Sequence, residues 1–389
     1  MRIALVDATA KPTCYPVALL KLGAWRRSLG DECSLLTNAL PAAGSVDEIW
    51  VSSTFTFDTP HTVGLVQAAM ERAPVVRVGG VAPTLVPRYY ARTGAVLHAG
   101  LVPEAEGFAP DYSLLPEPPA YSVTHASRGC SRSCGFCMVT RLEPEFIDRP
   151  HWMGDLADGA TELRFYDNNW LAKPGGLIER DVLALRELVA EGRVTRIDFN
   201  QGLDARLMTE DLADLLAGLP IRPVRFAFDN LSEDGPYQQA VRWMAARGSK
   251  EFMTYVLYNF TDTPADFYHR LRETVLLCAE LQVAVASFPM CYAPILEVDR
   301  QRAYVGRHWT PAMKRGFTAI RGNHSAQSGT ITPKSKSVFL PLEEFEFWFG
   351  ATPEEFIHRI SYPGVNKWAA RKAASLRQMR LERAGRVYS

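Results

Sequence analysis

The chain has 389 residues, of which 47% are hydrophobic and 22% charged, and its formal net charge is zero. This composition is ordinary for a globular protein and excludes a disordered, collagen-like or coiled-coil chain. No apolar run approaches the roughly 18–20 residues that span a bilayer, and the apolar run after Met1 is too short for a signal peptide. We therefore expect a cytoplasmic protein with no membrane partner.

Short β-branched runs alternate with helical patterns over residues 1–101. The predicted strands are Ile3–Val6, Cys33–Thr37, Glu48–Ser52, Val75–Val78 and Ala95–His98. Helices are predicted at Pro16–Gly30 and His61–Arg72. Strands that alternate with helices pair in parallel, so this part is predicted to be a Rossmann-like α/β domain. Five prolines follow within residues 102–120, which we interpret as a linker.

The alternation resumes at longer spacing over residues 121–295. The predicted strands are Tyr121–Ser127, Leu163–Asp167, Arg196–Asn200, Pro223–Phe228, Phe252–Tyr258 and Val283–Cys291. Between them, Gly176–Glu191 and Ala265–Leu281 carry apolar residues at helical spacing. Six β/α units predict a partial (β/α)6 barrel of the TIM type.

Residues 296–389 form a basic C-terminal extension. From Arg300 to Ser389 the chain has 16 Lys and Arg residues against 6 Asp and Glu residues. We predict loops over Arg302–Leu340, which contains no acidic residue, and a basic helix over Tyr362–Arg386. Aromatic residues lie among these charges: Trp309, Trp368 and Tyr388. The pattern predicts an anionic substrate or a nucleic acid as partner, or a lid that pairs with the acidic remainder of the chain.

Three of the seven cysteines lie close together, as Cys130, Cys134 and Cys137, in a C-x3-C-x2-C spacing. The other four are scattered, at Cys14, Cys33, Cys278 and Cys291, which indicates a reducing compartment rather than a disulfide framework. Thiolates so close in sequence indicate a common metal centre. One interpretation is a zinc-stabilised nucleic-acid-binding protein, although structural zinc requires a fourth ligand. The other is an iron–sulfur cluster with one iron open to a non-protein ligand.

The cysteine loop, with Phe136 before its last cysteine and its place after the first strand of the β/α series, resembles that of the radical SAM superfamily. The resemblance implies a [4Fe–4S] cluster on the three cysteines and S-adenosylmethionine (SAM) chelated to its open iron. It also implies reductive cleavage to a 5′-deoxyadenosyl radical that abstracts hydrogen from an unknown substrate, with methyl transfer as a further step in some members. An electron donor of the flavodoxin or ferredoxin type is then expected. A member that binds SAM without turnover is a remaining alternative.

The resemblance also suggests residues that contact the cofactor, Phe136 among them. Asp167, Asn168 and Asn169 follow the second barrel strand, where such families often use Gly-Gly-Glu to bind the SAM ammonium, but they also suit a turn or helix cap. Arg206, after the third strand, is a candidate for the SAM carboxylate or a surface residue. Cys291 and Tyr292 end the last strand and are candidate hydrogen donors to a product radical, or core residues.

Residues 1–120 resemble the cobalamin-binding-like domain that precedes the barrel in one branch of the superfamily. The matching segments are Tyr15–Gly23, Val78–Val81, Gly100–Glu104 and Pro110–Pro116. The D-x-H-x-x-G cobalt-ligand motif is missing after Asp7, and the first histidine of the chain is His61. Members of the branch can hold cobalamin without that ligand, so cobalamin is a candidate cofactor.

Overall fold

The computed structural model describes residues 1–298, 303–324 and 341–387 and divides into two compact units. The N-terminal unit comprises the described parts of residues 1–168, 188–195 and 294–303. The C-terminal unit comprises those of residues 169–187, 196–293 and 304–389. The predicted domain boundaries stay a prediction.

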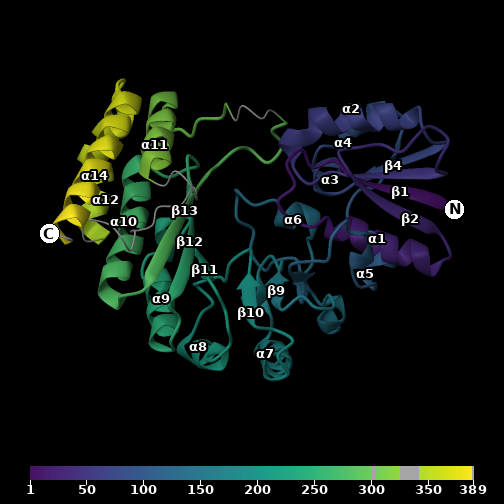
Figure 1. Cartoon of the computed structure of the whole chain (residues 1–389), viewed down its shortest axis with the longest axis horizontal. Coiled ribbons are helices and arrows are strands. Elements are labelled where there is room, and N and C mark those ends of the chain that lie inside the picture. The colour runs from purple at the N-terminus through teal and green to yellow at the C-terminus, as the bar shows by residue number, and fades with distance from the viewer. Residues whose placement is uncertain (299–302, 325–340, 388–389) are drawn as a thin grey trace. The chain divides into compact units, whose positions relative to one another are not determined.

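A five-stranded parallel sheet organises the N-terminal unit, in the order β2-β1-β3-β4-β5 (Figure 1). Its strands are β1 (Arg2–Asp7), β2 (Glu32–Thr37), β3 (Glu48–Ser52), β4 (Val75–Gly79) and β5 (Val96–Leu97). Helices α1 (Val17–Ser28) and α2 (Thr59–Met70) cover opposite faces. A strand covered on both faces reads as a continuous apolar run, as β1 does, which is why the sequence located these strands.

The proline-rich segment 102–120 packs on this sheet unit. It contains α5 (Pro103–Glu106) and a short 3-10 turn at Tyr112–Leu114. Ala105 and Leu114 are buried in the cluster that α1 forms with the sheet. Proline is tolerated in the first turn of a helix, so Pro103 begins α5 rather than an extended spacer.

The remaining elements of the N-terminal unit carry the cysteine loop. The predicted strand Tyr121–Ser127 is divided into β6 (Ser122–Thr124), which pairs in parallel with β9 (Glu162–Phe165), and β7 (Ser127–Arg128), which pairs antiparallel with β8 (Ile147–Asp148). The N-terminal unit also contains three short helices, α3 (Val81–Leu85), α4 (Pro87–Tyr90) and α6 (Val139–Leu142).

The C-terminal unit continues the β/α alternation. Its strands are β10 (Arg196–Phe199), β11 (Val224–Ala227), β12 (Glu251–Tyr258) and β13 (Ala284–Cys291), of which the last three form a parallel sheet. The helices between strands are α7 (Gly175–Ala190), α8 (Glu210–Leu216), α9 (Pro236–Ala246) and α10 (Pro264–Leu281). Thr263 and Asp266 form a reciprocal capping box that fixes the start of α10. The predicted parallel α/β class is confirmed.

Four helices pack outside α10 in the C-terminal unit: α11 (Pro311–His324), α12 (Pro341–Phe349), α13 (Pro353–Ser361) and α14 (Val365–Val387). The prediction of loops over Arg302–Leu340 was wrong for α11, and residues 325–340 lie outside the described residues. Within α11, Gly316 lets the helix approach α13 closely. A Cβ at Gly316 would lie 1.9 Å from the carbonyl oxygen of Ile360.

The predicted basic helix is confirmed as α14, and its apolar stripe is buried in the same core. That stripe is Val365, Ala369, Ala373 and Leu376. Trp309 belongs to this core too, because it is 4% exposed and its indole N–H donates to the Asp262 carbonyl at 3.1 Å. Its ring is therefore part of the core rather than of a binding surface. None of the described helices is long and apolar enough to cross a membrane.

The Gly316 contact gives a stability prediction with a matched control. Gly316→Ala should destabilise the C-terminal unit by about 1–3 kcal/mol, because α11 and α13 must separate to admit the methyl group. Gly322→Ala lies on the same helix with open space around it and should stabilise by up to about 1 kcal/mol through helix propensity. Calorimetric melting of both variants tests this, and equal shifts would contradict it.

Candidate functional site

The cysteine loop begins directly after β7. Gly129 has φ +77°, and a Cβ there would lie 2.1 Å from the carbonyl oxygen of Glu145, so the loop can start only with glycine. All three cysteines are partly exposed. The backbone N–H of Cys137 donates to the carbonyl of Cys134 at 3.0 Å, and the N–H of Arg132 donates to the Cys130 sulfur at 3.4 Å. The loop is therefore folded back on itself.

Glu143 anchors the loop by its side chain. One carboxylate oxygen accepts from the backbone N–H of Gly129 at 2.8 Å and from the Asn168 amide at 2.7 Å. The other accepts from Arg128 at 3.1 Å, and Arg128 also pairs with Glu106 at 3.0 Å. The structure thus places Asn168, predicted to contact SAM, as a support of the cysteine loop. The cofactor contact itself stays a prediction.

Asp167 has a similar position beneath the loop. It is 3% exposed, and its two oxygens accept hydrogen bonds from the backbone N–H of Ala126 at 3.0 Å and from the Ser127 hydroxyl at 2.6 Å. These bonds join the end of β9 to the chain that enters the loop. Its predicted contact with the SAM ammonium stays a prediction, as does the role of Phe136, which is partly buried within the loop.

The donor set of the loop consists of three thiols, the ligand type that holds iron–sulfur clusters. Among the residues that the structure describes, no group of three or more His, Cys, Asp or Glu side chains is gathered closely enough to hold one metal ion. Zinc would require four ligands, each within about 2.3 Å. A four-iron cluster binds each thiolate to a different iron, so its ligands stand farther apart. The three thiols of the loop, with an N–H···S hydrogen bond to the Cys130 sulfur, suit such a cluster in number and chemistry.

Asn169 and Arg206 meet in the C-terminal unit through Asp204. The Asn169 amide donates to Asp204 at 3.2 Å, and the Arg206 guanidinium binds Asp204 at 2.7 Å and Glu233 at 2.8 Å. Sequence reasoning did not find Asp204 or Glu233. Burial, followed by repulsion from Glu233, raises the pKa of the neighbouring Asp229 to about 7. The predicted role of Arg206 as a carboxylate ligand stays a prediction, since two carboxylates of the chain already bind its guanidinium.

Cys291 and Tyr292 end β13, as predicted. The Asn259 amide donates to the Tyr292 carbonyl at 3.1 Å and contacts the Cys291 sulfur at 3.6 Å. Cys291 also packs against the core of the C-terminal unit, and the Tyr292 ring lies 4.6 Å from that of Phe260. No observation tests their predicted role as hydrogen donors.

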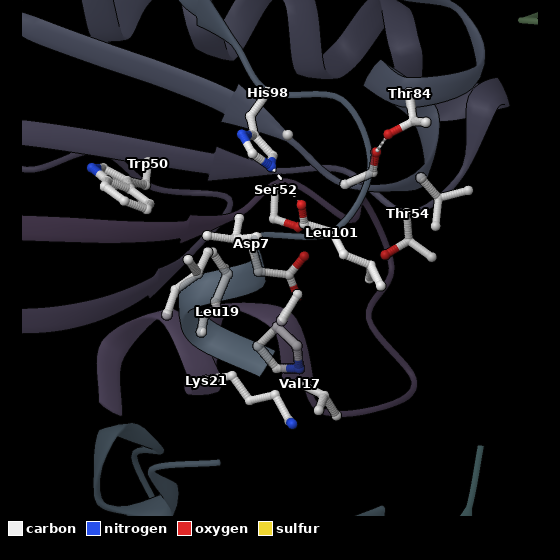
Figure 2. Close-up of a pocket in the computed structure, with 18 of the residues that line it drawn as sticks. Asp7, Val17, Leu19, Lys21, Trp50, Ser52, Thr54, Thr84, His98 and Leu101 are labelled. Atoms are coloured by element: carbon white, nitrogen blue, oxygen red, sulfur yellow. Dashed lines mark hydrogen bonds between the residues drawn. The ribbon is translucent and has the colours of Figure 1, made fainter. Parts of the chain in front are cut away.

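A cavity of about 560 Å³ lies within the N-terminal unit, at the carboxyl edge of its parallel sheet. Figure 2 shows Asp7 and Ser52 at the strand ends, Val17 and Lys21 from α1, and the hydrogen bond between His98 and Leu101. The tryptophans of the wall, Trp25 and Trp50, pack edge to face at 6.1 Å. The chain leaves β1 for β2 on one side while β3 lies on the other, which makes this edge a topological switch point, where ligands bind in open α/β sheets.

Two buried ionisable groups that sequence reasoning missed line the cavity. Lys21 is 1% exposed, and its ammonium donates to the Glu106 carbonyl at 3.2 Å. Burial lowers the pKa of Lys21. His125 is 8% exposed, and its pKa lies well below the ordinary histidine value because of burial, with Arg128 as the next cause. No sequence signal marks either residue, because Lys21 stands within an apolar run and His125 within a predicted strand.

Comparisons with known proteins identify solved structures with a similar fold. No family model matches the chain, and no curated protein matches it in sequence. One similar solved structure is that of the radical S-adenosylmethionine methyltransferase TsrM from Kitasatospora setae, with cobalamin and a [4Fe–4S] cluster bound. Its TM-score to this chain is 0.57 at 14% sequence identity, and the match covers 91% of this chain and 84% of TsrM. A second TsrM structure, with tryptophan substrate and the SAM analog aza-SAM, has a TM-score of 0.55 at 14% identity, covering 75% and 73%. The chain therefore shares its fold with a radical SAM methyltransferase, and the fold that the cysteine loop implied is confirmed.

Proposed function

We propose that the chain is a methyl-transfer enzyme of the radical SAM class, with a [4Fe–4S] cluster on Cys130, Cys134 and Cys137 and a corrinoid at the cavity of the N-terminal unit. The observation that carries the proposal is the coincidence of two features. The three-cysteine loop lies in a chain whose fold follows that of a cobalamin-containing methyltransferase over 91% of its length. Neither feature alone selects this chemistry, since a fold hosts many activities.

Around the cluster, the chain supplies ligands and a rigid support. With the cluster bound, SAM would supply the methyl group and a corrinoid would carry it to the acceptor. The three thiolates would hold the cluster, and the Arg132 N–H donates toward the Cys130 sulfur. Asp167 and Glu143 fix the backbone just before the first cysteine. Such second-layer hydrogen bonds orient ligands and tune a metal centre.

The cavity fits part of a corrinoid. A volume of about 560 Å³ lies in the usual range for ligand sites but is smaller than a whole corrinoid. The buried Nδ1 of His125, in the cavity wall, has no hydrogen-bond partner in the protein, and a ligand or an ordered water would satisfy it. The β1–α1 loop provides Ala8 and Thr9 after Asp7, so a corrinoid here would receive no cobalt ligand from the usual motif.

The remaining predicted features are hydrogen abstraction, a zinc site, an electron donor and an anionic substrate or partner. Hydrogen abstraction, which the sequence resemblance implied, takes second place, because the similar solved structures are of a methyltransferase. The cluster takes precedence over the zinc alternative, because a similar solved structure holds a [4Fe–4S] cluster. An electron donor of the flavodoxin or ferredoxin type stays part of the proposal. So does an anionic substrate or nucleic acid, for which the described portion of α14 offers the exposed Lys367 and Arg371.

The cluster assignment predicts the metal content. Anaerobically purified protein should contain about four iron and four sulfide ions per chain. Replacing all three loop cysteines with alanine should remove both, whereas Cys278→Ser, on α10, should retain them. Iron and acid-labile sulfide analysis measures this. Zinc in place of iron, or iron retained by the triple variant, would contradict the assignment.

The reaction class predicts the product of SAM. Protein reconstituted with iron and sulfide, and incubated anaerobically with SAM, hydroxocobalamin and dithionite, should release S-adenosylhomocysteine, since methyl transfer leaves that product. The triple cysteine variant serves as the control and should release none. Chromatography measures the products, and 5′-deoxyadenosine as the main product would favour hydrogen abstraction instead.

The position of Asp167 predicts a structural role before a binding role. Asp167→Asn should lose one of the two accepted hydrogen bonds, destabilise the N-terminal unit by about 1–3 kcal/mol and lower its iron content. Asp158→Asn, at an exposed site of the same unit, should change neither. Melting temperature and iron per chain are the measurements. Unchanged stability and iron with weaker SAM binding would show that Asp167 contacts the cofactor directly.

A further inference from the structure

Two histidines line the cavity of the N-terminal unit, and their ring nitrogens differ in environment. His98 is partly exposed, and its Nε2 lies 2.9 Å from the carbonyl of Leu101. His125 is 8% exposed, and its Nδ1 is fully enclosed without a hydrogen-bond partner. The chain holds His125 by its backbone instead, because Arg149 donates to the His125 carbonyl at 2.8 Å. The Nδ1 atom of this imidazole is thus enclosed without a partner in the protein.

The surroundings of His125 keep its ring neutral. Burial lowers its pKa most, followed by repulsion from Arg128, Arg149 and Lys21. The Tyr166 ring meets it edge to face at 6.2 Å and adds no charge at neutral pH, because burial raises the pKa of that phenol. A neutral imidazole carries one N–H donor and one acceptor nitrogen. A buried ring of this kind lowers stability until a ligand or water satisfies it.

The cations around the ring are paired with carboxylates of the same unit. Arg128 pairs with Glu106 at 3.0 Å and with Glu143 at 3.1 Å, and Arg149 contacts Asp155 at 3.3 Å. Lys21 is the remaining cation, and Glu106 and Asp155 both oppose the lowering of its pKa. Three cations thus face three carboxylates, and neither an anionic nor a cationic ligand group is required. An uncharged group that both donates and accepts, such as a primary carboxamide, suits this wall.

We propose that His125 is the recognition residue of the cavity, where its neutral ring forms a hydrogen bond with a carboxamide of the bound ligand. The inference rests on the proposed function in one respect, because a corrinoid ring carries primary amides at its edge. It adds to that function a side chain on the segment between β6 and β7 that selects the ligand by an uncharged contact. The cobalt atom plays no part in this contact.

The test uses cyanocobalamin as the probe and the full chain as the protein. By isothermal titration calorimetry, His125→Leu should bind cyanocobalamin about threefold to tenfold more weakly than the wild type. This is the loss of affinity expected when one hydrogen bond is removed. His125→Gln, which retains a donor and an acceptor, should stay within about threefold of the wild type. His61→Leu makes the same change outside the cavity of this unit and should leave the affinity unchanged.

Stability of the free protein separates recognition from structural support. Because the ring is unsatisfied in the free protein, His125→Leu should melt at the same or a higher temperature than the wild type while binding the probe less well. A lower melting temperature, or failure to fold, would show that the imidazole supports the structure and would overturn the proposal. An affinity equal to that of the wild type would overturn it as well.

The pH dependence tests the kind of ligand group. With an amide partner, the ratio of wild-type to His125→Leu affinity should stay constant between about pH 8 and about pH 6, because the ring remains neutral. A ratio that grows toward low pH would indicate an anionic group and overturn the amide assignment. If the wild type itself does not bind cyanocobalamin, the corrinoid part of the proposed function fails. If it binds and the variants match it, only the assignment of His125 fails.

Discussion

The buried carboxylate of Asp167 is the interaction on which the geometry of the cysteine loop depends. It accepts hydrogen bonds from Ala126 and Ser127, residues about forty positions earlier in the chain, and so fixes the point from which the loop departs. Glu143 repeats the arrangement from the other end of the loop, at Gly129. Charged acceptors make stronger hydrogen bonds than neutral ones, so two carboxylates can hold a segment that has little regular structure of its own.

The parallel sheet of the N-terminal unit imposes a second constraint. Parallel strands present all their carboxyl ends at one edge, and the order β2-β1-β3-β4-β5 opens a crevice there between connections that leave in opposite directions. Apolar side chains of α1 such as Leu19 form part of the wall, while Lys21 and His125 place polar groups within it. A predominantly apolar site with a few placed polar groups is how proteins combine affinity with selectivity.

The sequence predicted the regular elements well and the tertiary contacts poorly, for a physical reason. Strands such as β1 and β3 are recognisable because burial on both faces requires an unbroken apolar run. The helix α11 was missed because glycines such as Gly322 lower helix propensity locally. The close approach of Gly316 to a carbonyl in α13 is a tertiary contact that no local pattern reveals. Local sequence also could not reveal the hydrogen-bond partners of Asp167, because they lie in another element. It could not reveal the burial of His125, because burial depends on tertiary packing. The cysteine spacing was informative because all three ligands are local.

The pair of tryptophans beside the cavity has an optical consequence. Trp25 and Trp50 are two of eight tryptophans in the chain, and both stand in the cavity wall with their rings 6.1 Å apart. A ligand that absorbs in the near ultraviolet, as a corrinoid does, would take up their emission by energy transfer over so short a range. The other six indoles lie outside this wall and would supply a steadier background. The cavity therefore contains an intrinsic fluorophore that reports its own occupancy without any label.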